Sequence, residues 1–362
     1  MARRPTRRLF ALASLALACA TSCSGSDAPL PRATTWPEAD ALFRSDPRWL
    51  GADGAYSIPL GGERTLWLFG DTFVARDPRD PWRDPAFLRN TIGIQHGLDP
   101  SRALIRFYWQ TNDDGLPRSW LPEDGKVWHW PGHGIVIDGV LVMIWGRVGT
   151  PAGDPDGYEG AGPSRVLVVD NPGDEPAAWR PREGRVPADA HDVDLGGAVL
   201  REGNDVYVYG SRGALHEVFV ARYDVARVRE GDLSNPAWHA DGAWSTAEAP
   251  TAITGLNAPE YSVHHDAKLG KYVMAITEGY GAATLAIRVA DAPEGPWSEP
   301  RSFLRPPESF DDDAFVYAGK GHPELLGADL VMTYVPASFA ERDDEASRRT
   351  LYHPHFARLT WP

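Results

Sequence analysis

The sequence predicts an all-β fold, a five-bladed β-propeller built from four-stranded antiparallel blades. The chain of 362 residues contains 14 Trp, 36 Gly and 32 Pro, and this mixture of flat side chains and turn formers favours many short strands over long helices. One hairpin pattern also recurs five times along the chain. The copies are about sixty residues apart, which leaves room for four strands in each unit.

The second strand of each hairpin is the easiest to recognise, because it is strongly apolar and ends in glycine or a polar residue. The starts of these strands are separated by 75, 65, 66 and 58 residues. A first strand with small or polar residues at its start precedes each one, and a glycine-containing turn joins the two. The expected pairs are 52–57 with 66–71, 132–136 with 141–147, 196–200 with 206–212, 259–263 with 272–278, and 321–325 with 330–334.

A two-sheet sandwich is the competing all-β fold, but a sandwich does not predict five copies of one hairpin. Composition and charge show no shift that would mark a second domain. We therefore expect a signal peptide over residues 1–23, a tether over 24–44 and one propeller domain over 45–362.

The first 23 residues have the order of a bacterial secretory signal, with an arginine-rich start, an apolar run over 9–18 and then small residues. Cys19 and Cys23, the two cysteines of the chain, each follow small residues in a pattern that resembles a lipobox. Cys23 is our choice for the lipidated residue, since a flexible Ser-Gly-Ser segment follows it. The alternative is that both cysteines are incidental residues of a cleaved signal. Either case predicts export, to the cell envelope or beyond it.

The composition also limits the partners of the protein. The net charge is −14, and removing the four leader arginines leaves −18 for the rest. Such an acidic chain repels phosphate backbones and anionic headgroups, so we expect no nucleic acid partner and no membrane contact except through a lipid anchor. The body has no cysteine, which excludes disulfides and thiol nucleophiles. We expect a monomer with no cofactor.

In a propeller, antiparallel pairing brings the start of each first strand and the end of each second strand to the same end of the central channel, here called the mouth. Carboxylates gathered there fit acid–base chemistry on a glycosidic bond, in which one carboxyl stays protonated and another is ionised. First strands contribute Asp53, His133, Glu260, His322 and Glu324, and second strands contribute Asp71 and Arg212.

Each of these residues also has an ordinary structural explanation. Asp53 could belong to a turn and Asp71 could cap a strand end. The histidines could be hydrogen-bonded core residues, and Arg212 could neutralise acids. Aromatic residues such as Trp130 and Tyr261 can stack on sugar faces or pack between blades. An acidic run over 311–313, after Glu308, could hold a structural calcium ion or form a solvated turn.

Several segments resemble secreted bacterial proteins of the family called domain of unknown function 4185. They are 49–60, 66–73 with its Gly-Asp-Thr-Phe motif, 90–92, 130–132, 290–297 and 321–325 with its His-Pro-Glu-Leu motif. The resemblance implies a five-bladed propeller, and some members of that group are endo-acting D-arabinanases. It also implies that Asp53 and Asp71 form the acidic pair, with Glu260 as a third carboxylate. The chain departs from relatives at 128–133, where they often carry an acid.

These observations lead to the hypothesis of a glycoside hydrolase that cleaves a furanose-containing, arabinan-like polysaccharide. Asp53 and Asp71 would act as base or nucleophile and its partner, and Glu260 would donate the proton. A non-catalytic surface lipoprotein that binds glycan is the alternative, and a scaffold or adhesin that uses the acidic face is a further one. The expected substrate contacts are Asn90, Trp130, His133, Arg212, Tyr261, His322 and Glu324.

Overall fold

The computed structural model describes residues 29–154, 157–213, 215–256, 260–279, 283–311, 313–338 and 349–362. Strands dominate this part of the chain, and the α-helices described in it are short, α1 (Pro37–Asp40) and α2 (Val225–Arg229). Single 3-10 turns occur at Pro176–Ala178 and Pro307–Phe310. The prediction of an all-β fold is confirmed. No helix in the described ranges is long and apolar enough to cross a membrane.

Five antiparallel sheets of at least four strands contain most of the described strands. The first sheet contains β3 (Tyr56–Gly61), β4 (Arg64–Phe69), β7 (Thr91–His96) and β8 (Leu104–Tyr108). The second contains β11 (Val127–Ile137), β12 (Val140–Gly149), β14 (Arg165–Val169) and β15 (Arg182–Glu183), with β13 (Glu159–Gly160) paired to β12. The third contains β16 (Asp194–Glu202), β17 (Asp205–Arg212), β18 (Glu217–Asp224), β19 (Ala237–Ala240) and β20 (Ala243–Ser245), with β21 (Thr254–Gly255) paired to β18.

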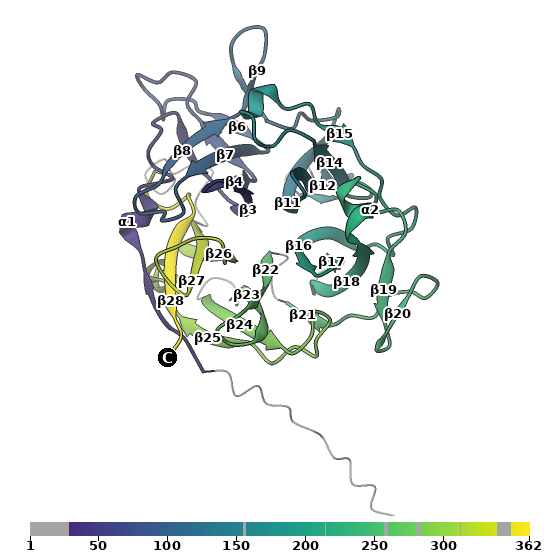
Figure 1. Cartoon of the computed structure of the whole chain (residues 1–362). Helices are drawn as coiled ribbons and strands as arrows, with labels where there is room; N and C mark the ends of the chain where they lie inside the picture. The colour runs from purple at the N-terminus through teal and green to yellow at the C-terminus, as the bar shows by residue number, and fades with distance from the viewer. Residues whose placement is uncertain are drawn as a thin grey trace, which may run out of the picture.

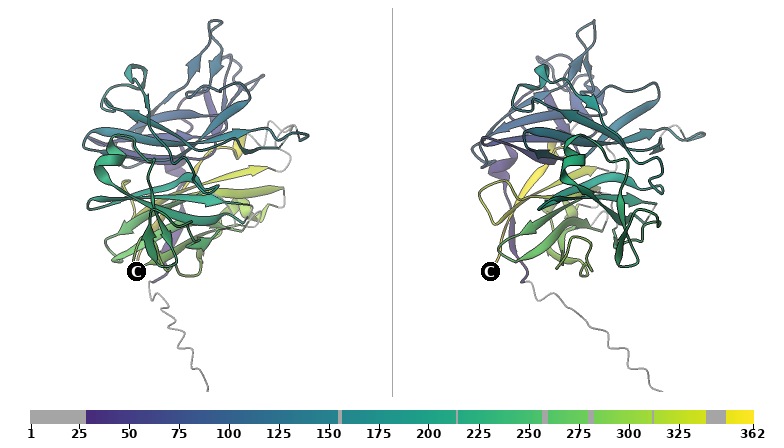
Figure 2. Two further views of the ribbon diagram at one scale, coloured as in Figure 1. Left: turned by 90° about the vertical axis from the view of Figure 1, so that its right-hand side faces the viewer. Right: turned by 45° about the vertical axis from the view of Figure 1, so that its right-hand side comes forward.

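The fourth sheet contains β22 (Tyr261–Asp266), β23 (Lys271–Glu278), β24 (Thr284–Ala290) and β25 (Arg301–Leu304). The fifth contains β26 (Ala314–His322), β27 (Leu330–Ser338), β28 (His355–Thr360) and β1 (Arg32–Thr35). Two small sheets add β2 (Trp49–Ala52), β5 (Thr72–Val74) and β6 (Ala86–Leu88), and the hairpin of β9 (Gln110–Thr111) with β10 (Pro117–Arg118). This hairpin projects from the rim of the molecule (Figures 1 and 2).

The large sheets are arranged around a common centre, with the first strand of each sheet innermost (Figure 1). These inner strands contact one another in succession, β3 with β11, β11 with β16, β16 with β22, and β22 with β26. The ring is completed between β26 and β3, where the Ser57 Oγ and His322 Nδ1 atoms lie 2.6 Å apart in a hydrogen bond. The ring therefore depends on polar contacts between inner strands as well as on apolar packing.

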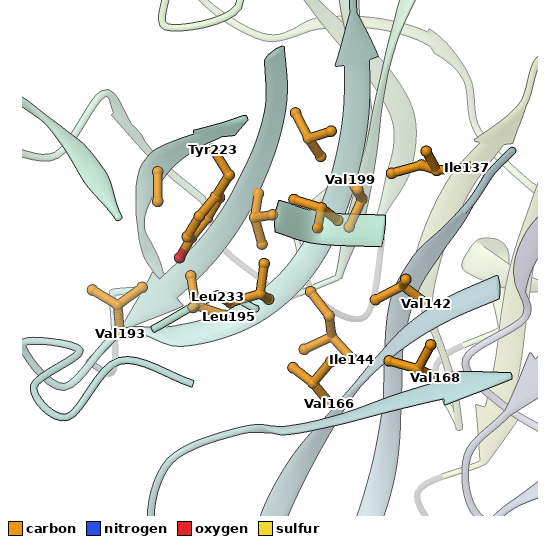
Figure 3. Packing of buried hydrophobic residues seen from close by; sticks show 14 of the residues in the cluster. Ile137, Val142, Ile144, Val166, Val168, Val193, Leu195, Val199, Tyr223 and Leu233 are labelled. Carbon is orange, nitrogen blue, oxygen red and sulfur yellow. The ribbon is translucent and has the colours of Figure 1, made fainter. Parts of the chain in front are cut away.

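Aliphatic side chains fill the space between neighbouring sheets. Figure 3 shows this packing between the second and third sheets, where Val142, Ile144 and Val166 face Leu195 and residues around it. All of these side chains are at most 5% exposed. Valine and isoleucine suit this role, because β-branched side chains pack well on a pleated surface.

Four of the five predicted hairpins occur close to their expected positions, and the fifth is displaced. The expected first strand at 321–325 is instead the end of β26, which starts at Ala314. The Gly319-Lys320-Gly321 segment disguised this strand in the sequence. Because of this displacement, Glu324 follows the far end of an inner strand and does not lie at its start.

Four inner strands carry an irregularity in register, at Pro59/Gly61 in β3, Pro131/Gly134 in β11, Leu195/Ala198 in β16 and Tyr317/Lys320 in β26. A bulge bends a strand and redirects its side chains. Trp130 and Tyr317, which precede two of these irregularities, donate hydrogen bonds to Asp71 and Asp53 at the mouth.

The predicted tether over 24–44 is wrong for its described part. Residues 32–35 form β1, which pairs with β28 near the C-terminus. Leu42 and Phe43 are buried, and the Phe43 ring stacks on Phe356 with a centroid distance of 5.0 Å. Apolar residues such as these are unsuited to a solvated linker. The predicted signal peptide, with Cys19 and Cys23, lies outside the described residues.

We expect Phe43→Ala to lower the free energy of unfolding by about 3–5 kcal/mol, because it leaves a cavity among packed aromatic rings. Urea denaturation of the chain without its first 28 residues measures this change. Leu104→Ala is the matched control, since Leu104 is 75% exposed and its loss should change stability by less than about 0.5 kcal/mol. Equal effects of the two substitutions would show that residues 36–43 are not part of the core.

Candidate active site

Three carboxylates gather at the mouth, as the sequence predicted. Asp53 lies between β2 and β3, Asp71 follows β4, and Glu260 precedes β22. The Asp53 backbone N–H donates a hydrogen bond to the Asp71 carbonyl at 3.4 Å. Gly70 makes this approach possible, because a Cβ atom there would lie 2.3 Å from Asp53 Oδ1. The glycine of the Gly-Asp-Thr-Phe motif therefore places the first two acids side by side.

Asp53 has the environment of a carboxyl that holds its proton. Burial raises the pKa of Asp53 well above its usual range, and the nearby charges of Asp71 and Glu260 raise it further. A hydrogen bond from the Tyr317 hydroxyl to Asp53 Oδ2, at 2.9 Å, and the charge of Lys320 oppose this rise. The balance favours the protonated form.

Asp71 is held by two donors. Trp130 Nε1 donates to Asp71 Oδ1 at 2.8 Å, and the Arg89 guanidinium donates to Oδ2 at 3.3 Å. Burial has the largest effect and raises the pKa of Asp71 above its usual value, although the hydrogen bond from Trp130 and the charge and hydrogen bond of Arg89 oppose the rise. The two neighbouring aspartates thus differ: Asp71 has a cation and an indole N–H as partners, and Asp53 has a single neutral donor.

Glu260 forms an ion pair with a residue that the sequence analysis missed. Lys320 Nζ lies 2.8 Å from Glu260 Oε1, and the lysine side chain is only 1% exposed. The ammonium group also lies 4.3 Å from the centroid of the Tyr56 ring, which stabilises it by a cation–π contact. The signal for Lys320 was present in the sequence, as a single lysine between two glycines in an apolar strand.

Aromatic side chains border Asp71 on its open side. The Trp130 ring contacts the Tyr158 ring edge-on, with centroids 4.9 Å apart, and Tyr158 is 66% exposed. Arg89 lies over the neighbouring Trp128 ring at 4.2 Å. Trp130 was an expected substrate contact, and its place beside Asp71 suits that role. Tyr158 and Arg89 were missed, because each lies in a loop whose course the hairpin pattern does not define.

His133 lies near the mouth but its ring is occupied by the scaffold. The Val199 N–H donates to His133 Nδ1 at 2.9 Å, so Nε2 carries the hydrogen and donates to the Ser57 carbonyl at 3.0 Å. Burial lowers the pKa of His133 to about 4. His133 is thus a neutral side chain that links β3, β11 and β16, and its expected role in binding sugar hydroxyls needs correction.

Three other expected contacts are also buried in the scaffold. Asn90 is fully buried. Its Oδ1 atom accepts a hydrogen bond from the Leu121 N–H, and its Nδ2 atom donates to the Leu121 and His129 carbonyls. His322 is 1% exposed and lies between Ser57 and Thr333. Tyr261 is fully buried beneath Gly197. None of these three side chains is accessible to a substrate, since the groups that would bind hydroxyls are covered or already paired.

The remaining expected residues lie apart from the three acids. Glu324 follows β26 next to Ser57, where burial raises its pKa, and its Oε1 atom has no partner in the described structure. Arg212 ends β17, stacks over Phe219 at 4.3 Å and lies 3.6 Å from Glu217. Both belong to other parts of the ring.

The acidic run considered for calcium lies partly outside the described residues, because Asp312 is not among them. Glu308 is engaged elsewhere, since it accepts a hydrogen bond from the Tyr334 hydroxyl at 3.3 Å and lies 3.3 Å from His355 Nδ1. Among the described residues, no group of three or more acidic, histidine or cysteine side chains could hold a metal ion.

The model of a family of unknown function, DUF5005, matches residues 38–361 of the chain. The chain belongs to this family. The DUF5005 match extends into the segment predicted as tether. The resemblance to domain of unknown function 4185 stays a prediction from the motifs. No curated protein matches the chain.

Solved structures resemble this DUF5005 chain in fold. A candidate hydrolase from Bacteroides ovatus ATCC 8483 has a TM-score of 0.70 at 19% identity, covering 90% of each chain. An endo-arabinase from Bacteroides thetaiotaomicron VPI-5482 has a TM-score of 0.46 at 14% identity, covering 85% of this chain and 94% of that one. An alpha-L-arabinofuranosidase from Lactobacillus brevis has a TM-score of 0.48 at 12% identity, covering 86% and 90%.

We expect Lys320→Met to lower the free energy of unfolding by about 3 kcal/mol at neutral pH, because it leaves the Glu260 carboxylate without its cation. Adding Glu260→Gln should recover most of that loss, and urea denaturation of both variants measures the coupling. Lys268→Met is the control, since Lys268 is 52% exposed in its pair with Asp329 and its loss should cost at most about 1 kcal/mol. Additive effects of the two substitutions would contradict the pairing.

Proposed function

We propose that this DUF5005 protein is a glycoside hydrolase with a five-bladed β-propeller fold. One observation carries the proposal: two adjacent carboxyl groups at the mouth have different environments, and burial raises the pKa of both, that of Asp53 well above its usual range. Asp53 is buried beside two other acids, whereas Asp71 accepts hydrogen bonds from Arg89 and Trp130. Hydrolysis of a glycosidic bond uses such a pair. The five large sheets around one centre support the propeller (Figure 1).

The geometry suggests a division of roles that differs from the sequence hypothesis. Asp53 donates its proton to the leaving glycosidic oxygen. Asp71, which accepts hydrogen bonds from Arg89 and Trp130, either activates a water molecule or attacks the anomeric carbon. Glu260 is ion-paired with the buried Lys320 ammonium at 2.8 Å. We assign Glu260 and Lys320 to positioning: their opposite charges lie close to Asp53 and act on its pKa in opposite directions.

The substrate we propose is a polysaccharide that contains furanose units, as the resemblance in the motifs implies. Trp130 and the exposed Tyr158 ring give a sugar face an aromatic surface beside Asp71. We also propose that the protein is exported and anchored through Cys23. Both the sugar and the anchor follow from the sequence, and each needs its own experiment.

Asp53→Asn and Asp71→Asn should each lower the turnover of a cleaved glycan by at least about a thousandfold, because each removes a carboxyl from the reacting pair. Release of reducing ends from arabinans, arabinogalactan, fructans and xylan by residues 29–362 is the measurement. Asp77→Asn is the control, since Asp77 lies away from the three acids and pairs with Arg79 at 2.9 Å.

Two results would contradict the hydrolase. Activity that persists in both variants would place the chemistry elsewhere. Calorimetric binding of an oligosaccharide without any release of reducing ends would instead support a glycan-binding surface protein. In an active enzyme, NMR of the first product distinguishes attack by water from attack by Asp71, because the two routes give opposite anomers.

Stability should depend on the protonation of Asp53. Its pKa is higher in the folded state than in the unfolded chain, so its contribution is present at low pH and is lost as pH rises through the folded-state pKa. The melting temperature of Asp53→Asn relative to the natural protein should therefore increase between pH 4 and pH 8. The Arg79 hydrogen bonds lower the pKa of Asp77 to about 2, so its contribution changes only below pH 4 and the Asp77→Asn difference should stay nearly constant between pH 4 and pH 8. A constant difference for Asp53→Asn would exclude a raised pKa.

A further inference from the structure

A cleft of about 450 Å³ lies beside the candidate active site. Its walls come from segments outside the five large sheets, namely β6, the β9–β10 hairpin and the loop over 119–123. The lining residues that matter here are Arg76, Phe87, Gln110, Leu116, Arg118 and Glu123.

One side chain, Arg89, links the lining of the cleft to Asp71. The Arg89 guanidinium lies 5.0 Å from the centroid of the Phe87 ring, which lines the cleft, and the same guanidinium donates to Asp71. Pairing of β6 with β5, which begins directly after Asp71, fixes this arrangement in the backbone. Arg89 therefore contacts both an acid of the candidate site and the wall of the cleft.

The lining combines apolar surface with positive charge. Phe87 is 46% exposed and Leu116 is 38% exposed, and such surface suits the face of a sugar ring. Arg118 lies opposite Gln110 in the β9–β10 register. In the described structure Arg118 has no ion pair or hydrogen bond through its side chain, and Arg76 has only Asp84, at 3.6 Å and 84% exposed.

Arg118 and Arg76 give the cleft two cations in a chain of net charge −14. A guanidinium binds a carboxylate through two parallel hydrogen bonds, a geometry that a neutral hydroxyl does not match. Glu123 is the one acidic side chain of the lining. Its negative charge opposes the binding of an anion, but it is smaller than the combined positive charge of the two arginines.

We propose that this cleft binds an acidic sugar residue, such as a uronic acid unit, with Arg118 as the main contact to its carboxylate and Arg76 as a second cation. The ring of that residue lies against Phe87 and Leu116. That this residue belongs to the same glycan as the bond cleaved at Asp53 and Asp71 rests on the proposed function. Recognition of the carboxylate by Arg118 does not depend on it.

Calorimetric titration of residues 29–362 with trigalacturonate and with neutral arabinotriose tests the proposal. We expect trigalacturonate to bind more tightly, and Arg118→Gln to weaken its binding about tenfold while leaving arabinotriose unchanged. Arg118→Lys keeps the charge but loses the fork, so its effect should be intermediate. Arg102→Gln is the matched control, because Arg102 is exposed and lies at the other end of the first sheet. The preference should shrink as salt rises to about 0.5 M.

Equal affinity for the two probes, or binding of trigalacturonate that Arg118→Gln does not change, would overturn the proposal. The Asp53→Asn variant separates this result from a failure of the hydrolase, since it should bind trigalacturonate like the natural protein. If no glycan is cleaved but binding depends on Arg118, the acidic-sugar site stands and the hydrolase fails. If arabinan is cleaved but trigalacturonate does not bind, the hydrolase stands and the acidic-sugar site fails.

Discussion

The candidate site depends on one buried ammonium group. Lys320 lies in the innermost strand of the fifth sheet and contacts Glu260 from the fourth and Tyr56 from the first. Acidic groups that lie close together repel one another, and the Lys320 charge, which pairs with Glu260 and lowers the pKa of Asp53, reduces that repulsion. Lys320 contacts residues of two other sheets. Its side chain therefore both reduces the repulsion between the acids and connects three sheets at the mouth.

Other polar side chains also connect the inner strands. His133 connects three strands through two backbone groups, and Ser57 pairs with His322 across the junction of the first and fifth sheets. These histidines are neutral or fully buried, so they orient backbone and do not exchange protons with a ligand. The scaffold thus uses histidines, a residue type that is often catalytic. Only their hydrogen-bond partners show that these histidines have a structural role.

The sequence predicted the strands and the acids better than the connections between them. Periodic apolar segments identified β4, β12, β17, β23 and β27, because buried central strands must be apolar whatever their neighbours are. Asp53 and Asp71 were predictable since each adjoins such a strand. Lys320 stood out only as a lone lysine between two glycines, and its pairing with Glu260 could not be predicted, because the two residues are sixty positions apart and such a pair has no local signature. The cleft was unpredictable for a similar reason, as its walls come from short strands and a loop that lie outside the repeated hairpins.

The pairing of β1 with β28 has a consequence for the biosynthesis of the protein. The fifth sheet takes its outer strand from residues 32–35 and its neighbour from residues 355–360, so the strand over 32–35 has no partner until residues 355–360 have been made. Until then Trp36, Leu42 and Phe43 lack the Phe356 side of their packing. An all-β topology with such distant contacts folds slowly, and ring closure is a late step. A chain that stops a few residues early would leave an aromatic surface and an unpaired strand edge exposed, the features that quality-control proteases and aggregation both select.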